Sequence, residues 1–140
     1  MTASLAGEIS LSKLISTLTP ILNGATFVFV TLPSCDIPHD VVPRMLFREA
    51  EGVTLIMEKS EAQAHKLPYT FPCRMITCNV HSSLEAVGFL AAITAELAKA
   101  GMGVNPVSGY FHDHLFVPES REDEAMGLLR RLANNVDLKS

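Results

Sequence analysis

The densest group of chemically versatile side chains is the triplet His112-Asp113-His114. On a β-strand, successive side chains point to opposite faces, so the two imidazoles share one face and the carboxylate of Asp113 points to the other. Two imidazoles one residue apart can chelate zinc, but a third ligand is needed and only His81 or His39 offers itself. We therefore predict no metal site. Asp113 is expected to accept hydrogen bonds from the nearby hairpin turn or to pair with the ammonium of a ligand.

A second candidate site lies where a predicted strand leads into a helix. The four residues SSLE from Ser82 onward have the capping-box pattern, in which a serine and an acid three residues later satisfy the first backbone N–H groups of a helix. We expect a helix from Ser82 to Lys99, whose N-terminus would attract the α-carboxylate of an amino acid. Glu85 is expected to act mainly as the internal cap, whereas Gly88 would let a ligand or a strand approach closely. The ligand-binding residues predicted here are Ser82, Ser83, Leu84, Glu85 and Gly88.

A turn in the first half of the chain supplies the remaining candidates. Gly52 can adopt the positive φ that a tight hairpin turn requires, and Glu51 beside it carries a carboxylate that could reach a cleft between the halves. Glu51 and Gly52 therefore join the predicted ligand site, with Glu51 as a second partner for an ammonium group. The alternative is that Glu49 and Glu51 are only solvated, as exposed glutamates commonly are.

The sequence offers little for catalysis. Three cysteines, Cys35, Cys73 and Cys78, form an odd set without CxxC spacing, which argues against a disulfide framework and against a cysteine-rich zinc site. No serine nucleophile motif, P-loop or GxGxxG fingerprint occurs. We therefore predict a protein that is not an enzyme and needs no cofactor, in a reducing, cytoplasmic compartment.

Composition narrows the choice of partners. The 140 residues are 48% hydrophobic and 19% charged, with a formal net charge of −4 and no run of basic residues. A globular chain with this charge lacks the positive surface expected of a nucleic-acid binder. The longest apolar stretch, around residues 84–95, is interrupted by charged and small residues and is too short to span a bilayer. We expect neither nucleic acid nor a membrane as partner.

The order of predicted elements indicates the fold. Hydrophobic periodicity, caps and turn residues predict a helix over 11–22 that Pro20 shortens, a strand over 26–32, a loop over 33–43, strands over 44–49 and 53–58, a helix opened by Ser60, a strand over 74–81, the helix over 82–99, strands over 103–109 and 112–117, and a last helix capped by Ser120. This order predicts an α+β protein with antiparallel sheets covered by helices on one face, the ferredoxin-like arrangement. Prolines at 68 and 72 place the joint between halves 1–70 and 71–140.

The apolar faces of these elements define the expected core. It comprises Leu14, Leu18, Val28, Leu55, Ile76, Val80, Leu90, Ile93, Leu97, Phe116, Leu129 and Leu132.

Three segments carry a family resemblance: FREAEGVTL at 47–55, VHSSLEAVG at 80–88 and GYFHDHLFV at 109–117. In this order they resemble a family of small two-unit ACT-domain proteins, related to the regulatory ACT pairs of aspartokinase and of the CASTOR arginine sensors. The resemblance implies two βαββαβ halves and a role in sensing small molecules. Because the chain carries no kinase or dehydrogenase domain, any enzyme that it regulates would be a separate partner.

We therefore expect a regulatory protein that binds an amino acid between its halves, with the carboxylate at the backbone of residues 82–84 and the ammonium at Asp113 or Glu51. An apolar helix and open sheet edges predict a homo-oligomer, most simply a dimer. Two alternatives stay open. One is a protein–protein interaction module without its own ligand, and the other is a metal-dependent enzyme built on His81, His112 and His114.

Overall fold

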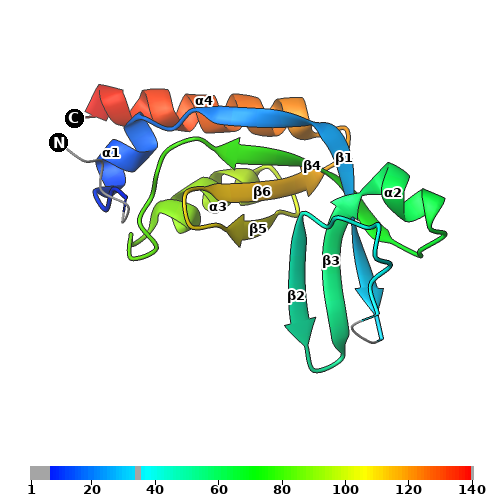
Figure 1. Cartoon of the computed structure of the whole chain (residues 1–140). Coiled ribbons are helices and arrows are strands. Elements are labelled where there is room, and N and C mark those ends of the chain that lie inside the picture. Colours follow the sequence, from blue (N-terminus) through cyan, green and yellow to red (C-terminus); the bar gives the residue numbers. More distant parts are fainter. Residues whose placement is uncertain (1–6, 34–35, 140) are drawn as a thin grey trace. The chain divides into compact units, whose positions relative to one another are not determined.

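The computed structural model describes residues 7–33 and 36–139 (Figure 1). The elements follow in the predicted order along the chain. They are α1 (Leu11–Ser16), β1 (Pro20–Leu32), β2 (Met45–Glu49), β3 (Gly52–Glu58), α2 (Lys59–Ala64), β4 (Thr70–Cys78), α3 (Phe89–Lys99), β5 (Asn105–Ser108), β6 (Asp113–Pro118) and α4 (Glu122–Lys139).

The chain divides into two compact units that do not follow the chain order. Unit 2 is the continuous segment Gly24–Arg74, and unit 1 is formed by the residues on both sides of it, up to Asn23 and from Met75 onward. The long strands β1 and β4 pass from one unit into the other. The predicted division of the chain into halves 1–70 and 71–140 stays a prediction.

Unit 1 is a sheet packed against helices α1, α3 and α4 (Figure 1). Its strands lie in the order β1-β4-β6-β5, and β5 pairs with β6 in antiparallel register. Alternate residues of β4 and β6 point to the helices because side chains of a strand alternate between faces. The helices contribute residues three or four positions apart, as an amphipathic helix does. The buried cluster includes Leu14, Leu18, Ile76, Cys78, Phe89, Ile93, Leu97, Leu115, Val117, Ala125 and Leu129.

Unit 2 is a smaller sheet with strand order β2-β3-β1-β4 and one short helix, α2. The antiparallel register places Val28 opposite Met57 and Val30 opposite Leu55, so these four side chains share one face. Together with Val53 and Ala62 they form the core of unit 2. The α+β class, with antiparallel strand pairs and helices packed on the sheet, is as the sequence predicts.

The predicted core is confirmed with small exceptions. Leu14, Leu18, Val28, Leu55, Ile76, Ile93, Leu97, Phe116 and Leu129 are buried, whereas Val80, Leu90 and Leu132 are half-buried at the margin of the unit 1 core.

In the first half of the chain, Pro20 shortens the first helix as predicted, but two boundaries expected from the sequence are wrong. Helix α1 ends at Ser16, and strand β1 already begins at Pro20, because the backbone before a proline is pushed out of the α-helical region. The helix expected from Ser60 instead begins at Lys59, and the side chain of its N-cap residue Glu58 makes no capping hydrogen bond. The apolar residues at 21 and 22 belong to a strand, where helical and strand periodicity are hard to distinguish over a short run.

The capping boxes predicted in the second half are also wrong. Helix α3 begins at Phe89, with Gly88 as its N-cap at φ +89°, so the segment from Ser82 is not its first turn. Residues 83–86 instead form a turn, closed by a 3.0 Å hydrogen bond from Ala86 N–H to the Ser83 carbonyl. Helix α4 begins at Glu122, and Ser120 has φ +78°, a left-handed conformation unlike the extended one of an N-cap.

Glycine is required at position 52 by its backbone and by its surroundings. Its φ is +152°, and a Cβ there would lie 2.4 Å from the carbonyl oxygen of Leu32. We expect Gly52→Ala to lower the free energy of unfolding by about 1–3 kcal/mol. The control is Gly127→Ala in α4, where a Cβ would meet no atom within 4 Å and should raise stability by about 0.5–1 kcal/mol. Urea unfolding of the two variants checks the prediction, and effects of the same sign would contradict it.

Candidate functional site

A cavity of about 180 Å³ in unit 1, lined only by residues of the predicted second half, brings together four of the eight predicted site residues. Its lining comes from the segment before α3, from the first turn of α3 and from the β5–β6 hairpin. The lining residues are Ser82, Ser83, Leu84, Ala86, Phe89, Leu90, Ser108, Gly109 and Asp113. A larger cavity of about 350 Å³ in unit 2 is lined by apolar and hydroxyl side chains and by no charged one, so it offers less for a charged ligand.

Asp113 is the charged group of the unit 1 cavity. It opens strand β6, faces the cavity and is only 7% exposed. The Ser108 hydroxyl donates to Oδ1 over 2.5 Å, and the Ser82 hydroxyl donates to Oδ2 over 3.4 Å. Among the residues that the structure describes, no cationic side chain forms an ion pair with Asp113. Since hydroxyl donors compensate a buried charge only in part, a cation entering the cavity would be stabilised here.

The positive pole of the cavity is the N-terminus of α3. Phe89 and Leu90, the first two residues of this helix, line the cavity. The first backbone bond at this end runs from Ala92 N–H to the Gly88 carbonyl over 2.9 Å, and in the described part of the chain no side chain caps the helix. The N–H groups of the first turn therefore lack an intrahelical partner, and the helix dipole adds partial positive charge.

The backbone donors predicted at residues 82 and 83 are already used. Ser82 N–H bonds the Val80 carbonyl, and Ser83 N–H bonds the Glu8 carbonyl, each over 2.9 Å. Glu8 and Ser82 form an isolated parallel bridge, in which Glu8 N–H also bonds the His81 carbonyl over 2.8 Å. The expectation that these two N–H groups receive a carboxylate is therefore wrong in this detail. A carboxylate contact at the backbone of Leu84 stays a prediction, and further donors lie in the first turn of α3.

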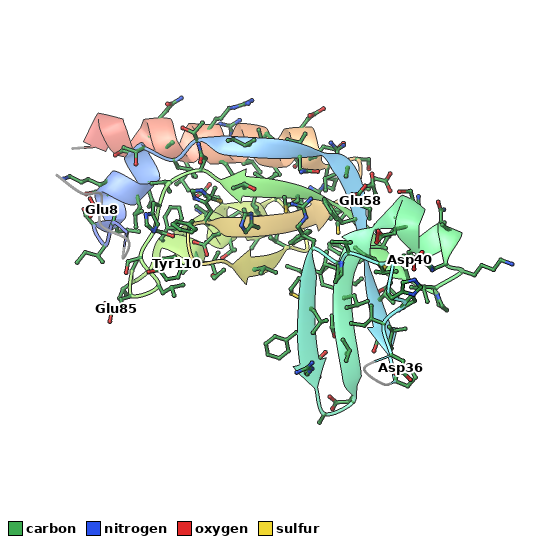
Figure 2. All side chains as sticks on the ribbon, in the orientation of Figure 1. Glu8, Asp36, Asp40, Glu58, Glu85 and Tyr110 are labelled. Atoms are coloured by element: carbon green, nitrogen blue, oxygen red, sulfur yellow. The ribbon has the colours of Figure 1, made fainter. Side chains whose placement is uncertain are left out.

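The remaining predicted residues are not in the lining of this cavity. Glu85 is exposed at the same end of unit 1 as Glu8 and Tyr110 (Figure 2), and its N–H bonds the Ser83 hydroxyl over 3.0 Å. At Gly88 a Cβ would contact only Leu11, at 3.5 Å, so the glycine is explained by its positive φ. Glu51 is exposed and lies with Gly52 at the β2–β3 turn of unit 2.

Sequence reasoning missed Ser108, Gly109, Phe89, Leu90 and Ala86 as lining residues. Ser108 could have been predicted from the sequence as a lining residue, because it pairs with Asp113 across the β5–β6 hairpin. A residue directly opposite a candidate acid in an antiparallel pair lies beside it on the same face. The first residues of α3 were missed because the helix was predicted to begin at Ser82, whereas it begins at Phe89.

The histidines are engaged in separate contacts. His112 Nδ1 lies 3.2 Å from the Val80 carbonyl, and His114 Nδ1 lies 2.9 Å from the Thr77 hydroxyl. Their ring centroids are 6.4 Å apart, and His81 packs against Phe111 with centroids 5.1 Å apart. Within residues 7–33 and 36–139, no three His, Cys, Asp or Glu side chains are grouped so that they could hold a metal ion.

With this geometry in view, comparison with known proteins identifies the family. Two family models described as ACT domain match residues 6–74 and 70–131. Together they cover almost the whole chain, which belongs to the ACT-domain family as a small protein of two ACT domains. The resemblance seen in the sequence, and the pair of ferredoxin-like halves that it implies, are thereby confirmed.

Solved structures show the same fold. A Vibrio cholerae protein of unknown function, described as a possible transport protein, is 36% identical, with a TM-score of 0.78 over 88% of this chain and 95% of its own. An Agrobacterium tumefaciens protein is 14% identical, with a TM-score of 0.71 over 83% of this chain and 89% of its own. The ligand-free regulatory subunit of aspartate kinase from Thermus thermophilus is 9% identical, with a TM-score of 0.64 over 83% and 96%. No curated protein matches the sequence, and no helix in the described residues is long and apolar enough to span a bilayer.

Cys78, a residue of β4 in the buried core of unit 1, gives the stability of the protein a pH dependence. Burial, and secondarily the negative charge of Asp113, raise the pKa of its thiol from 9.0 to about 12. Between these values the unfolded thiol loses its proton and the folded one keeps it. We therefore expect stability to fall as pH rises above about 9, by about 1.4 kcal/mol per pH unit until the folded thiol ionises. Unfolding of the parent and of Cys78→Ala at pH 8 to 11 checks this, since equal slopes would contradict it.

Proposed function

We propose that this protein is a regulatory ACT protein of the cytoplasm that binds a small zwitterionic amino acid in the unit 1 cavity and has no catalytic activity. The observation that carries the proposal is that one cavity has a buried carboxylate, Asp113, and an uncapped helix N-terminus, that of α3. A ligand with an ammonium and a carboxylate would satisfy both poles at once.

The polarity of the cavity supports one orientation of the ligand. Its ammonium contacts Asp113, where Ser82 and Ser108 leave room for a further donor on the carboxylate oxygens. Its carboxylate contacts the first N–H groups of α3. Its side chain lies against Leu84, Phe89 and Leu90. A volume of about 180 Å³ is below the roughly 300–1,000 Å³ of cavities for drug-sized ligands, so the ligand is a small amino acid.

The chemistry of the lining, and of Cys78 in the core beside Asp113, supports binding without reaction. The raised pKa of the Cys78 thiol, about 12, keeps it protonated near neutral pH and unreactive as a nucleophile. The hydroxyls of Ser82 and Ser108 both donate to the carboxylate of Asp113, and in the described residues no imidazole bonds either serine, as a serine nucleophile would require.

Regulation of a separate enzyme is supported by the family and by the neighbours. The Thermus thermophilus and Porphyromonas gingivalis relatives are described as a regulatory subunit and a putative regulatory domain of aspartate kinase. By analogy of fold, this protein would act in trans on a partner enzyme when its ligand is bound.

Replacing the buried carboxylate should abolish most of the affinity. In Asp113→Asn the serine hydrogen bonds can be kept with a neutral amide, so the fold is retained and the ammonium loses its counter-charge. Loss of a desolvated charge pair costs about 2–5 kcal/mol, so the Kd for the amino acid should rise at least about thirtyfold. Asp123→Asn on the exposed surface of α4 is the matched control. Calorimetry decides, and an unchanged Kd in Asp113→Asn would remove this residue from the site.

The roles of Asp113 and of the N-terminus of α3 can also be tested by changing the ligand. A thermal-shift screen of the twenty amino acids should find one that stabilises the parent protein, by about 2.7 kcal/mol at 100 times its Kd. The amine that lacks the carboxylate and the acid that lacks the ammonium should each bind at least about tenfold more weakly. If no amino acid shifts the transition, the interaction-module alternative replaces the proposal. If the amine binds as well as the amino acid, the role of α3 is wrong.

A further inference from the structure

The cavity of about 350 Å³ in unit 2 lies at the C-terminal end of strand β1. It is lined by residues 29–31 of β1, by Thr54 of β3 and by residues 68–70, which lead into β4. None of these residues belongs to the proposed amino-acid site, which lies in unit 1. The volume is within the roughly 300–1,000 Å³ that is typical of small-molecule sites.

Strand β1 extends beyond the start of its neighbour β4. It lies between β3 and β4 in the sheet, and it has thirteen residues where β4 has nine. A 2.9 Å bond from Asn79 N–H to the Thr19 carbonyl sets the last residue of β4 beside the first residue of β1. At the other end of β4, Cys73 Sγ donates to the Phe27 carbonyl over 3.3 Å. The last residues of β1 therefore have no β4 residue beside them.

This end of β1 keeps polar backbone groups on the side of the cavity. On its other side β1 pairs with β3 as far as Leu32, with Thr31 opposite Thr54. Along a strand, the N–H and C=O groups of alternate residues point to opposite sides, so those not bonded to β3 point to the cavity. Pro68 in the facing segment has no N–H. Outside the strand ladders, no backbone bond within the described residues joins residues 67–69 to β1.

The facing segment is bracketed by two unusual backbone conformations. Lys66 and Phe71 have φ of +54° and +57°, in the left-handed region that is an outlier for a bulky side chain. The ring of Phe71 packs edge-on against that of Phe29, with centroids 5.9 Å apart, which connects this segment to β1. Such conformations persist only where the surrounding structure holds them, and they cluster at ligand-binding positions.

The side chains of the lining carry no charge. Phe29 and Tyr69 supply aromatic surface, on which a flat ring packs well. Thr31, Tyr69 and Thr70 supply hydroxyl groups, which donate or accept hydrogen bonds. The hydroxyl of Thr54 donates to the carboxylate of Glu49, so its oxygen is left as an acceptor. Because an ion would lose its hydration here without a counter-charge, this lining favours a neutral ligand with polar edges.

We propose that the unit 2 cavity binds a small, flat, uncharged ring compound with an N–H donor next to a carbonyl acceptor, and that this edge pairs with the free end of β1. Nucleobases and cyclic dipeptides share this chemistry. The donor and the acceptor take the place that a longer β4 would occupy. A ring fits better than a peptide strand, because the few residues of β1 beyond β4 offer only a short row of hydrogen bonds.

NMR titration of the whole chain locates the ligand. The probes are uracil, a nucleobase, and cyclo(Gly-Gly), a cyclic dipeptide, each added to about 10 mM, where a compound with a Kd of about 1 mM nearly saturates its site. We expect the backbone amide signals of Thr31, Thr54 and Thr70 to shift, and the tighter probe identifies the source. No shift with either probe, or shifts confined to unit 1, would overturn the proposal.

The hydrogen-bonded edge is tested with a matched compound. 1,3-Dimethyluracil has the same ring and carbonyl groups as uracil but no N–H, so its Kd should be at least about tenfold higher. If both compounds bind equally, the pairing with β1 is wrong.

Filling the cavity tests its role. Thr31→Trp places a large side chain at an exposed strand position, where aromatic residues are well tolerated, and should raise the Kd of the tighter probe at least about tenfold. Thr70→Trp, which fills the cavity from β4, should do the same. The matched control is Ile21→Trp, at a position of β1 that is 48% exposed and outside the lining. Unchanged affinity in both threonine variants would overturn the site. All three variants should keep the affinity for an amino acid, so the two proposals stand or fall separately.

Discussion

The site depends on a carboxylate that is buried with hydroxyl partners and without a cation. Ser108 and Ser82 hold the two oxygens of Asp113, and each belongs to a different part of unit 1. Ser108 ties the acid to the edge strand β5, and Ser82 ties it to the segment that leads into α3. Because neutral donors compensate a buried charge only in part, this arrangement fixes the position of the carboxylate and leaves its charge available.

A contact between Glu8 and Ser82, which are far apart in the sequence, determines where the N-terminus of α3 lies. In the bridge between Glu8 and Ser82, the carbonyl of Glu8 accepts from Ser83 N–H, and Glu8 N–H donates to the carbonyl of His81. The segment around Ser82 is therefore held in an extended conformation and does not form the first turn of a helix. The helix starts instead at Phe89, after Gly88 has turned the chain through a left-handed conformation. The consequence is that the free end of α3 faces the cavity, where a serine cap would have shielded it.

Much of the fold could be predicted from local pattern, and the largest error at the site has a physical origin. Periodicity located the strands, the order of elements and nearly all of the core, since a residue such as Ile93 repeats on one face of its helix. The SSLE pattern at Ser82 led to a wrong prediction, because a capping motif does not show whether a residue far away in the sequence, here Glu8, will accept hydrogen bonds from its N–H groups. Asp113 was found from its place between two histidines. Ser108 could have been found from hairpin register, whereas the role of Glu8 could not.

The insertion of unit 2 within unit 1 has a consequence for how the protein is made. Residues 24–74 are continuous, so all of unit 2 is synthesised before the second segment of unit 1, which begins at Met75. The core of unit 1 joins Leu14 near the start of the chain to Leu129 in the last helix. Helix α1 must therefore wait, with its apolar face uncovered, until the segment that carries α4 has been synthesised. During biosynthesis the amino-terminal segment is thus the part of the chain most in need of protection by a chaperone.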